Sequence, residues 1–255
     1  MIKKTLGMVI ILLITVSWNN QNTDKNTLVS QKSKTITFGT KSGEDLTIKK
    51  SLIKPYTPNN LSDYEGCYDF GFSEGEYILR VILDKKSIIV QKISYETESP
   101  ESTTFVKVYK NIEFEKLNKN KFMNKEYRGI FAKIEIEKKI QKGLLFTGLK
   151  WNFSEFGYKN SSFEKCLNGK YKKTFYKYLT KEDIKGISVK DLKIMRNEIF
   201  ARYGYKFKSA GKMDKYFSTK SWYKGQYKNV DSFLTKIEKS NILFLKKHEL
   251  LENKK

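Results

Sequence analysis

The stretch Tyr77-Ile78-Leu79-Arg80-Val81-Ile82-Leu83, followed by Asp84-Lys85-Lys86-Ser87 and then Ile88-Ile89-Val90, decides the fold class of the central region. Two short apolar runs separated by a polar turn are typical of a β-hairpin. We therefore predict two antiparallel strands that meet at Lys85 and Lys86.

Further strand-like segments lie on both sides of this hairpin. They are Thr35-Ile36-Thr37-Phe38, Thr103 to Phe114, Gly129 to Ile136, Leu144-Leu145-Phe146 and Leu149-Lys150-Trp151. Short strands with local turns predict an antiparallel β meander, barrel- or sandwich-like, over residues 35–172. The stretch from Asp63 to Phe70 resembles the opening strand of lipocalin-like barrels, so a ligand-holding barrel is an alternative to a plain β module.

From Lys181 onward the apolar residues change to helical spacing. A face made of Val189, Leu192, Met195, Ile199 and Tyr203 predicts a helix. Ser188 precedes it as an N-cap, and Gly204 follows it as a left-handed C-cap. A short helix over residues 210–217 and a last helix from about Asp231 complete a small all-α module, residues 173–255. The predicted fold class is therefore α+β.

This helical region concentrates aromatic and charged residues in three separated blocks. They are Arg196-Asn197-Glu198-Ile199-Phe200-Ala201-Arg202-Tyr203-Gly204-Tyr205-Lys206-Phe207, then Tyr216-Phe217, then Trp222-Tyr223. In this order they resemble the signature of the YARHG domain family over about residues 175–250. The resemblance implies a small extracytoplasmic module of bacterial envelope proteins with a binding or envelope-association role and no established activity.

The sequence departs from the family signature at two positions. Phe200 stands where the first tyrosine belongs, and Tyr203 stands where the histidine belongs. Histidine would have been the natural acid–base or metal-binding candidate in the motif. Its replacement argues against chemistry at this motif.

Two interpretations of the motif residues remain open. In the structural one, Glu198 pairs with Arg202 along the helix, Arg196 and Asn197 hold loop carbonyls after Gly204, and the aromatics fill a miniature core. In the functional one, the aromatics and arginines form a surface that recognises a glycan or peptide. The candidate binding residues are Arg196, Asn197, Glu198, Phe200, Arg202, Tyr203, Gly204, Tyr205, Phe207, Trp222 and Tyr223.

The N-terminus has the layout of a secretory signal peptide. Met1-Ile2-Lys3-Lys4 is basic, Leu6 to Val16 is apolar, and Thr15-Val16-Ser17 offers a cleavage site. We predict a signal peptide at residues 1–17, a flexible linker at 18–34, and no transmembrane segment after cleavage. Trp18 leaves an uncleaved anchor as the alternative. The predicted location is the periplasm or the cell surface.

Export changes the interpretation of the two cysteines. In an oxidising compartment, an even number of cysteines usually indicates disulfide bonding. We predict a bond between Cys67 and Cys166, with two buried free thiols as the alternative.

The net charge of +22 predicts an acidic partner or simply a solvated lysine-rich surface. Only Arg80, Arg128, Arg196 and Arg202 are arginines, the residue that best recognises phosphates and guanine edges. This disfavours nucleic acid. The predicted partner is a cell-envelope component or a protein.

Signals for catalysis are weak along the whole sequence. His248 is the one histidine, so we predict no metal site. The sequence has no P-loop and no Rossmann glycine fingerprint after a strand, so we predict no cofactor. The spacing of Gly71-Phe72-Ser73-Glu74-Gly75 matches a nucleophile elbow, but a strand follows it where a helix is required. Glu74 with Glu76, or Glu135 with Glu137, has the two-residue spacing of one strand face and not of a glycosidase cleft.

We therefore predict an exported envelope protein with a non-catalytic binding role, its preferred ligand an anionic glycan or peptidoglycan. The second hypothesis is a lipocalin-like β-barrel carrier or inhibitor, with the helical module as its anchor. A glycan hydrolase using Glu74 or Glu135 is the remote third hypothesis.

Overall fold

A computed structural model describes residues 35–39, 45–71, 76–84, 87–98, 100–115, 117–136, 138–150 and 153–252. The predicted signal peptide and linker lie outside these residues, as do Phe72 to Gly75 of the glycine-rich turn and Glu137.

The strands and helices follow one another in two blocks. The strands are β1 (Thr35–Gly39), β2 (Asp45–Lys49), β3 (Lys54–Pro55), β4 (Gly66–Asp69), β5 (Tyr77–Asp84), β6 (Ser87–Thr97), β7 (Phe105–Phe114), β8 (Lys121–Met123), β9 (Tyr127–Ile136), β10 (Lys139–Gly148) and β11 (Phe153–Ser161). The helices are α1 (Phe163–Cys166), α2 (Lys173–Tyr176), α3 (Val189–Ala201), α4 (Lys212–Phe217) and α5 (Lys236–Glu252), with short 3-10 turns η1 (Lys50–Leu52), η2 (Leu61–Tyr64) and η3 (Glu182–Ile184).

The main sheet is antiparallel and has nine strands. Its order is β3-β9-β10-β11-β4-β5-β6-β7, and β8 pairs with β9. β5 and β6 form an antiparallel pair that extends to Asp84 opposite Ser87, which confirms the predicted hairpin. An antiparallel sheet followed by helices confirms the predicted α+β class. The division into domains at residues 35–172 and 173–255 stays a prediction.

The last strand of the sheet pairs with an early one. β11 lies between β10 and β4, so the two ends of the β region meet inside the sheet. The strand series predicted from the sequence ends at Trp151 and does not include β11. Gly157 interrupts any simple alternation there, and a Cβ at this position would come within 2.3 Å of the Phe70 ring.

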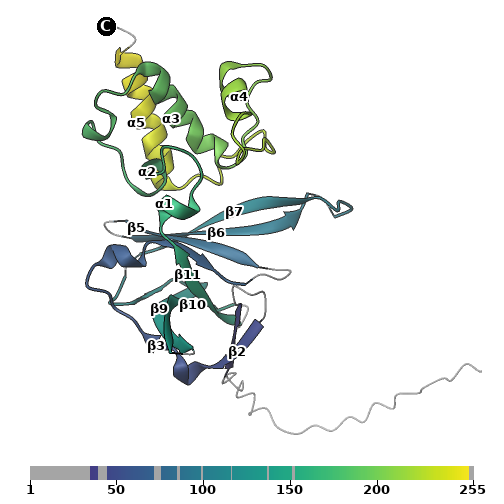
Figure 1. The fold of residues 1–255 in the computed structure, drawn as a ribbon, viewed down its shortest axis with the longest axis vertical. Helices are drawn as coiled ribbons and strands as arrows, with labels where there is room; N and C mark the ends of the chain where they lie inside the picture. Colours follow the sequence, from purple (N-terminus) through teal and green to yellow (C-terminus); the bar gives the residue numbers. More distant parts are fainter. Residues whose placement is uncertain are drawn as a thin grey trace, which may run out of the picture. The chain divides into compact units, whose positions relative to one another are not determined.

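Aromatic side chains fill one face of the sheet. The largest fully buried side chains of this core are Tyr64, which η2 contributes, and Tyr68, Phe114, Phe122, Phe131 and Phe146. The opposite face of β5, β6 and β7 packs against the helices, which lie over these strands in Figure 1. Ile93 and Tyr109 of the sheet share a core with Leu192, Met195 and Ile199 of α3.

The helix boundaries follow their capping residues. The hydroxyl of Ser188 accepts a hydrogen bond from the Asp191 N–H, as predicted for the start of α3. α5 begins at Lys236 and not near Asp231, because Thr235 and Glu238 form a reciprocal capping box. Among the described residues, no helix combines the length and apolar character needed to cross a membrane.

A disulfide joins the sheet to the helical region. Cys67 of β4 bonds to Cys166 of α1, and the S–S distance is 2.02 Å. This confirms the predicted pair and excludes the alternative of two free thiols. Cys67 is buried together with Ile82, Ile89 and Phe163 in the core between sheet and helices.

Candidate functional site

The C-terminal end of α3 places the motif residues of the helical module. The Gly204 N–H donates to the Ala201 carbonyl, and the Tyr205 N–H donates to the Phe200 carbonyl. This pair of bonds is a Schellman motif, which requires a left-handed residue at Gly204, whose φ is +72°. The chain therefore turns sharply after Tyr203 and passes back along the module.

A buried ion pair ties α3 to the loop that precedes α2. One Glu198 oxygen lies 2.8 Å from an Arg202 nitrogen, and both side chains are 3% exposed. The Glu198 carboxylate also accepts the backbone N–H groups of Lys170 and Tyr171. The Arg202 guanidinium donates to the carbonyls of Asn168 and Tyr171. The predicted pairing of Glu198 with Arg202 is present, and the pair organises a loop as well.

Gly169 allows this loop to approach the carboxylate. Its φ is +94°, and a Cβ at this position would lie 2.4 Å from the Glu198 carboxyl group. A side chain at this position would therefore collide with the carboxylate and also strain the backbone. The glycine is part of the Glu198 site, although nothing in the local sequence pattern marked it.

Tyr203 links the module to the sheet through a buried polar network. Its hydroxyl donates to Glu238 over 2.6 Å and accepts from the Gln91 side-chain amide over 2.9 Å. Gln91 belongs to β6 and Glu238 to α5, and each is fully buried. Burial raises the pKa of the Glu238 carboxyl, opposed by the hydrogen bond from Tyr203 and by the charge of Arg202.

Replacing Tyr203 with phenylalanine should lower the free energy of unfolding by about 1–3 kcal/mol, because Gln91 and Glu238 both lose a buried partner. Chemical denaturation of the full chain measures this. Tyr205→Phe is the matched control, because the Tyr205 hydroxyl makes no hydrogen bond to any described residue. Equal midpoints for the two variants would contradict the structural role of the Tyr203 hydroxyl.

Arg196 and Asn197 do not hold the turn after Gly204, and the prediction that they do was wrong. Arg196 pairs with Glu249 of α5 at 2.7 Å. The side-chain amide of Asn197 donates to the Lys193 carbonyl one helical turn earlier. The turn is held by backbone bonds instead, because the Gly204 carbonyl accepts from the N–H groups of Gln226 and Tyr227.

The motif aromatics form a compact cluster around the turn. Phe207 stacks on Phe217 with ring centroids 5.1 Å apart, and Trp222 meets Phe217 edge to face. Tyr223 donates its hydroxyl to the Tyr205 carbonyl, and Phe200 packs beside the Tyr205 ring. Only Phe217 is fully buried, so the cluster is both a small core and an aromatic surface.

A small cavity lies where this surface meets the sheet, and we call it the junction pocket. Its volume is about 220 Å³. The sheet contributes two cations and three aromatic residues, and the helical region contributes two further cations, one aromatic residue and two amide side chains. The residues are Arg80, Tyr95, Phe105, Tyr109 and Lys107 from the sheet, and Arg202, Trp222, Lys224, Asn168 and Gln226 from the helical region.

Arg80 is a cation of the junction pocket that is held largely by contacts within the protein. Its Nη1 donates to the Gln91 side chain, and its guanidinium lies 5.3 Å from the centre of the Phe175 ring. Its Nε is buried and has no hydrogen-bond acceptor among the described residues. Burial lowers the Arg80 pKa, and the nearby Glu238 charge opposes this. Arg202 also uses its donors within the protein.

The structure divides the predicted site residues into two groups. Glu198, Arg202 and Tyr203 belong to the internal network, whereas Trp222 lines the junction pocket with its side chain partly exposed. Arg80 and the aromatics of β6 and β7 were missed as site residues. The sequence does contain one signal for this site, which is the arginine inside the apolar run of residues 77–83. An arginine is rarely buried in such a run unless it has a specific partner.

Comparison with curated proteins and with solved structures finds no match. The family comparison agrees with the motif blocks, and it covers nearly the range that the sequence resemblance indicated. Residues 170–249 match the family model of the YARHG domain, so the C-terminal third of the chain carries a YARHG domain, an extracytoplasmic domain of unclear function.

Proposed function

We propose that the chain is a non-catalytic binding protein of the bacterial cell envelope, and that the junction pocket holds a carboxylate-bearing glycan such as peptidoglycan. The observation that carries this proposal is the lining of the junction pocket, where Arg80, Lys107 and Lys224 lie with the rings of Tyr95, Phe105 and Trp222. Cations beside aromatic rings suit a ligand that combines a negative charge with an apolar face.

The lining chemistry supports an anionic sugar ligand. Arginine and lysine recognise carboxylates by charge-assisted hydrogen bonds. Tyr95, Phe105 and Trp222 offer ring faces and edges against which the apolar side of a sugar ring can pack. The volume, about 220 Å³, is below that of pockets for drug-sized molecules and suits one sugar residue or a short acidic side chain.

A binding role fits this lining better than catalysis does. No carboxylate, histidine or cysteine is among the described residues that line the junction pocket, so the side chains that most often act as general acids and bases do not contribute to this lining. Burial raises the pKa of Tyr109 to about 12, which keeps its hydroxyl protonated at neutral pH. The hydrolase hypothesis named Glu74, which lies outside the described residues, and Glu135, which lines a different pocket.

The packed interior of the sheet weighs against the carrier hypothesis. Tyr68, Phe122, Phe131 and Phe146 are each at most 2% exposed and occupy the space that a lipocalin-like ligand would need. A ligand therefore has more room at the junction pocket than inside the sheet.

The proposal is tested by sedimentation of the full chain with purified peptidoglycan sacculi across a salt series. Phe105 is 63% exposed and Lys224 is exposed, so Phe105→Ala with Lys224→Gln should fold normally. We expect this variant to lose about tenfold in affinity, as a ring and a cation at the pocket rim are removed.

The matched control is Leu243→Ala with Lys185→Gln, which removes an equally exposed apolar residue and one lysine away from the pocket. Binding should persist at high salt, because surface charge alone is screened within about 10 Å at 0.1 M. Equal binding by the rim variant and the control would overturn the proposal.

A further inference from the structure

Three lysines lie side by side across three neighbouring strands at one end of the sheet. Lys54 of β3 is directly opposite Lys133 of β9, and Lys133 is directly opposite Lys142 of β10. Residues opposite each other in an antiparallel pair have Cβ atoms about 5 Å apart, and like charges in such positions are destabilising. We call these residues the lysine row.

Within the described residues, no carboxylate forms an ion pair with the lysine row, although Glu135 lies in the same pocket as Lys54 and Lys133. The Lys142 ammonium lies 4.7 Å from the centre of the Tyr56 ring, which holds it in place without cancelling its charge. An alignment of unpaired like charges is stabilised when an external anion binds.

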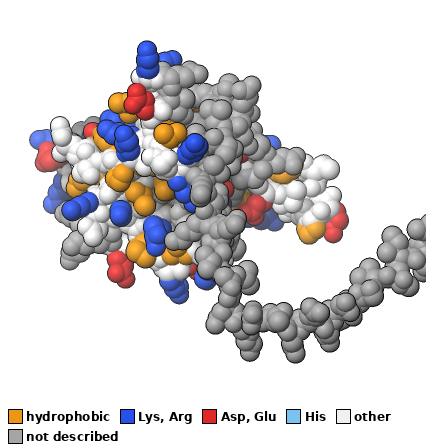
Figure 2. Space-filling view, turned by 90° about the horizontal axis from the view of Figure 1, so that it is seen from below, with side chains coloured by type: hydrophobic (Ala, Val, Ile, Leu, Met, Phe, Trp, Pro, Cys, Tyr) orange, Lys and Arg blue, Asp and Glu red, His pale blue; other side chains and the backbone are white. Residues whose placement is uncertain are grey.

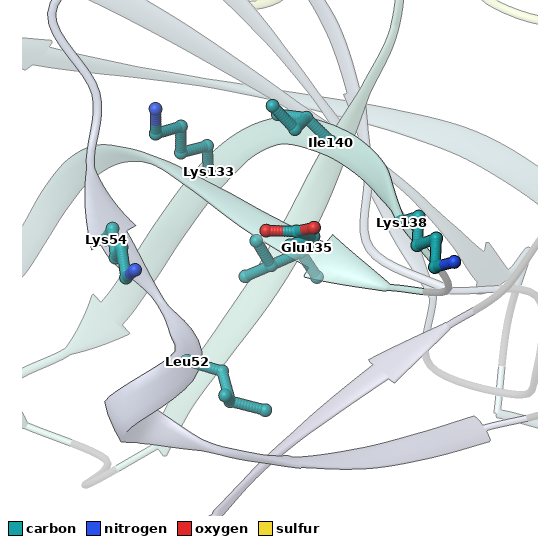
Figure 3. Close-up of a pocket in the computed structure, with 7 residues that line it drawn as sticks. Leu52, Lys54, Lys133, Glu135, Lys138 and Ile140 are labelled. Atoms are coloured by element: carbon teal, nitrogen blue, oxygen red, sulfur yellow. The ribbon is translucent and has the colours of Figure 1, made fainter.

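Apolar residues accompany the lysines at the same end of the sheet. Leu52, Lys54, Lys133, Lys138, Glu135 and Ile140 line an open pocket of about 450 Å³, in which Glu135 lies between Lys54 and Lys138 (Figure 3). Leu52 is 51% exposed and Ile140 is 61% exposed. Seen from below, this end shows Lys and Arg side chains interspersed with hydrophobic ones and few acidic ones (Figure 2).

The two segments that build this end are both rich in lysine. Residues 49–54 read Lys-Lys-Ser-Leu-Ile-Lys, and residues 138–142 read Lys-Lys-Ile-Gln-Lys. Each segment surrounds an exposed apolar residue with lysines.

We infer that this end of the sheet docks on the surface of an anionic phospholipid bilayer. The lysine row contacts the headgroup charges, and Leu52 with Ile140 enters the boundary between headgroups and acyl chains. A soluble polyanion would use the lysines and would gain nothing from two exposed aliphatic residues, whereas a bilayer uses both. This site is separate from the junction pocket and does not rest on the proposed glycan ligand.

The test is cosedimentation of the full chain with phosphatidylcholine vesicles that contain or lack phosphatidylglycerol. The measured quantity is the ratio of the two affinities, because an apolar N-terminal segment would bind both vesicles. The triple variant Lys54→Gln, Lys133→Gln and Lys142→Gln should reduce this ratio by about a hundredfold, since each lysine near an anionic surface contributes about a factor of five. Removing a like-charge alignment should not lower the melting temperature, so misfolding cannot imitate this result.

The matched control is Lys185→Gln, Lys190→Gln and Lys212→Gln, which removes the same charge from exposed positions of the helical region. A reduction in the ratio of less than tenfold is expected. Glu135→Gln should raise the ratio, because this carboxylate faces the same pocket as the lysines. Equal losses for the two triple variants would mean that net charge alone acts, and would overturn the inference.

A second variant separates a bilayer from a soluble polyanion. Leu52→Ser with Ile140→Ser should weaken binding to phosphatidylglycerol vesicles by about tenfold or more and leave binding to soluble polyphosphate unchanged. Unchanged vesicle binding by this variant, together with full competition by polyphosphate, would assign the lysine row to a soluble polyanion and contradict bilayer docking.

Discussion

Replacing both cysteines, Cys67→Ala with Cys166→Ala, is expected to lower the free energy of unfolding by about 4–5 kcal/mol. The disulfide closes a loop with a sequence separation of 99 residues, and a cross-link of that length removes much of the entropy of the unfolded chain. It is the largest single effect that we expect from a change at two positions.

The location of the disulfide increases the effect. Cys67 is 3% exposed and packs in the core that joins β4, β5 and β6 to the helices. Loss of the bond frees α1 from β4 and weakens the attachment of the helical module to the sheet. Exposing Phe163 or Leu167 would add to the loss, because each is nearly fully buried in the same core.

Urea denaturation of the oxidised chain, the reduced chain and the double variant measures this contribution. Reduction should lower the midpoint of the wild type to near that of the variant, and reductant should not change the variant further. A wild type whose midpoint is insensitive to reductant would show that the bond contributes little. A disulfide of this kind is typical of proteins that fold in an oxidising compartment, which supports the proposed export.

Local signals in the sequence predicted local structure well. The helix α3 with its Ser188 cap and its Gly204 turn, and the hairpin of β5 and β6, each depend on residues close together in the chain. The disulfide was predictable because only one pairing of two cysteines exists. The YARHG motif identified the region of the helical module because its blocks occur in order.

Features that depend on strand register could not be predicted in this way. In the lysine row, Lys54 of β3 is far in sequence from Lys133 and Lys142 of the β9–β10 hairpin, and only the observed strand pairing and register make the three neighbours. Arg80 became a site residue for the same reason, since the helices that cover its strand face are absent from the local pattern. The side-chain amides of Gln91 and Asn111, on neighbouring strands, both donate to the Phe233 carbonyl, a contact that depends on how the helical region packs on the sheet.

Replacing Glu198 with glutamine is expected to lower the free energy of unfolding by about 3 kcal/mol, or roughly 6–12 °C in melting temperature. The two Glu198 oxygens now accept the backbone N–H groups of Lys170 and Tyr171. Glutamine keeps one acceptor oxygen, but its NH₂ group would face one of these two N–H donors. The Arg202 guanidinium would lose its closest counter-charge in a site where both side chains are 3% exposed. The remaining carboxylate near Arg202 is Glu238, at 4.0 Å, which compensates only in part.

Two further variants locate the effect within the site. Gly169→Ala should destabilise the chain as well, because its Cβ would overlap the Glu198 carboxyl group. Glu182→Gln, at an exposed position of η3, should change the free energy of unfolding by less than about 0.5 kcal/mol. A combined Glu198→Gln and Gly169→Ala variant should cost less than the sum of the two, since both disturb the same loop.

The Glu198 result also decides between the two interpretations of the YARHG motif. A large loss of stability with binding to sacculi retained below the melting temperature would mean that Glu198 and Arg202 build the module, and that recognition belongs to residues such as Arg80 and Trp222 at the junction pocket. An unchanged melting temperature with lost binding would place the ligand at Glu198 and Arg202 themselves. The burial of this pair and its bonds to the loop at residues 168–171 favour the first outcome, because a ligand would have to displace internal bonds to reach either side chain.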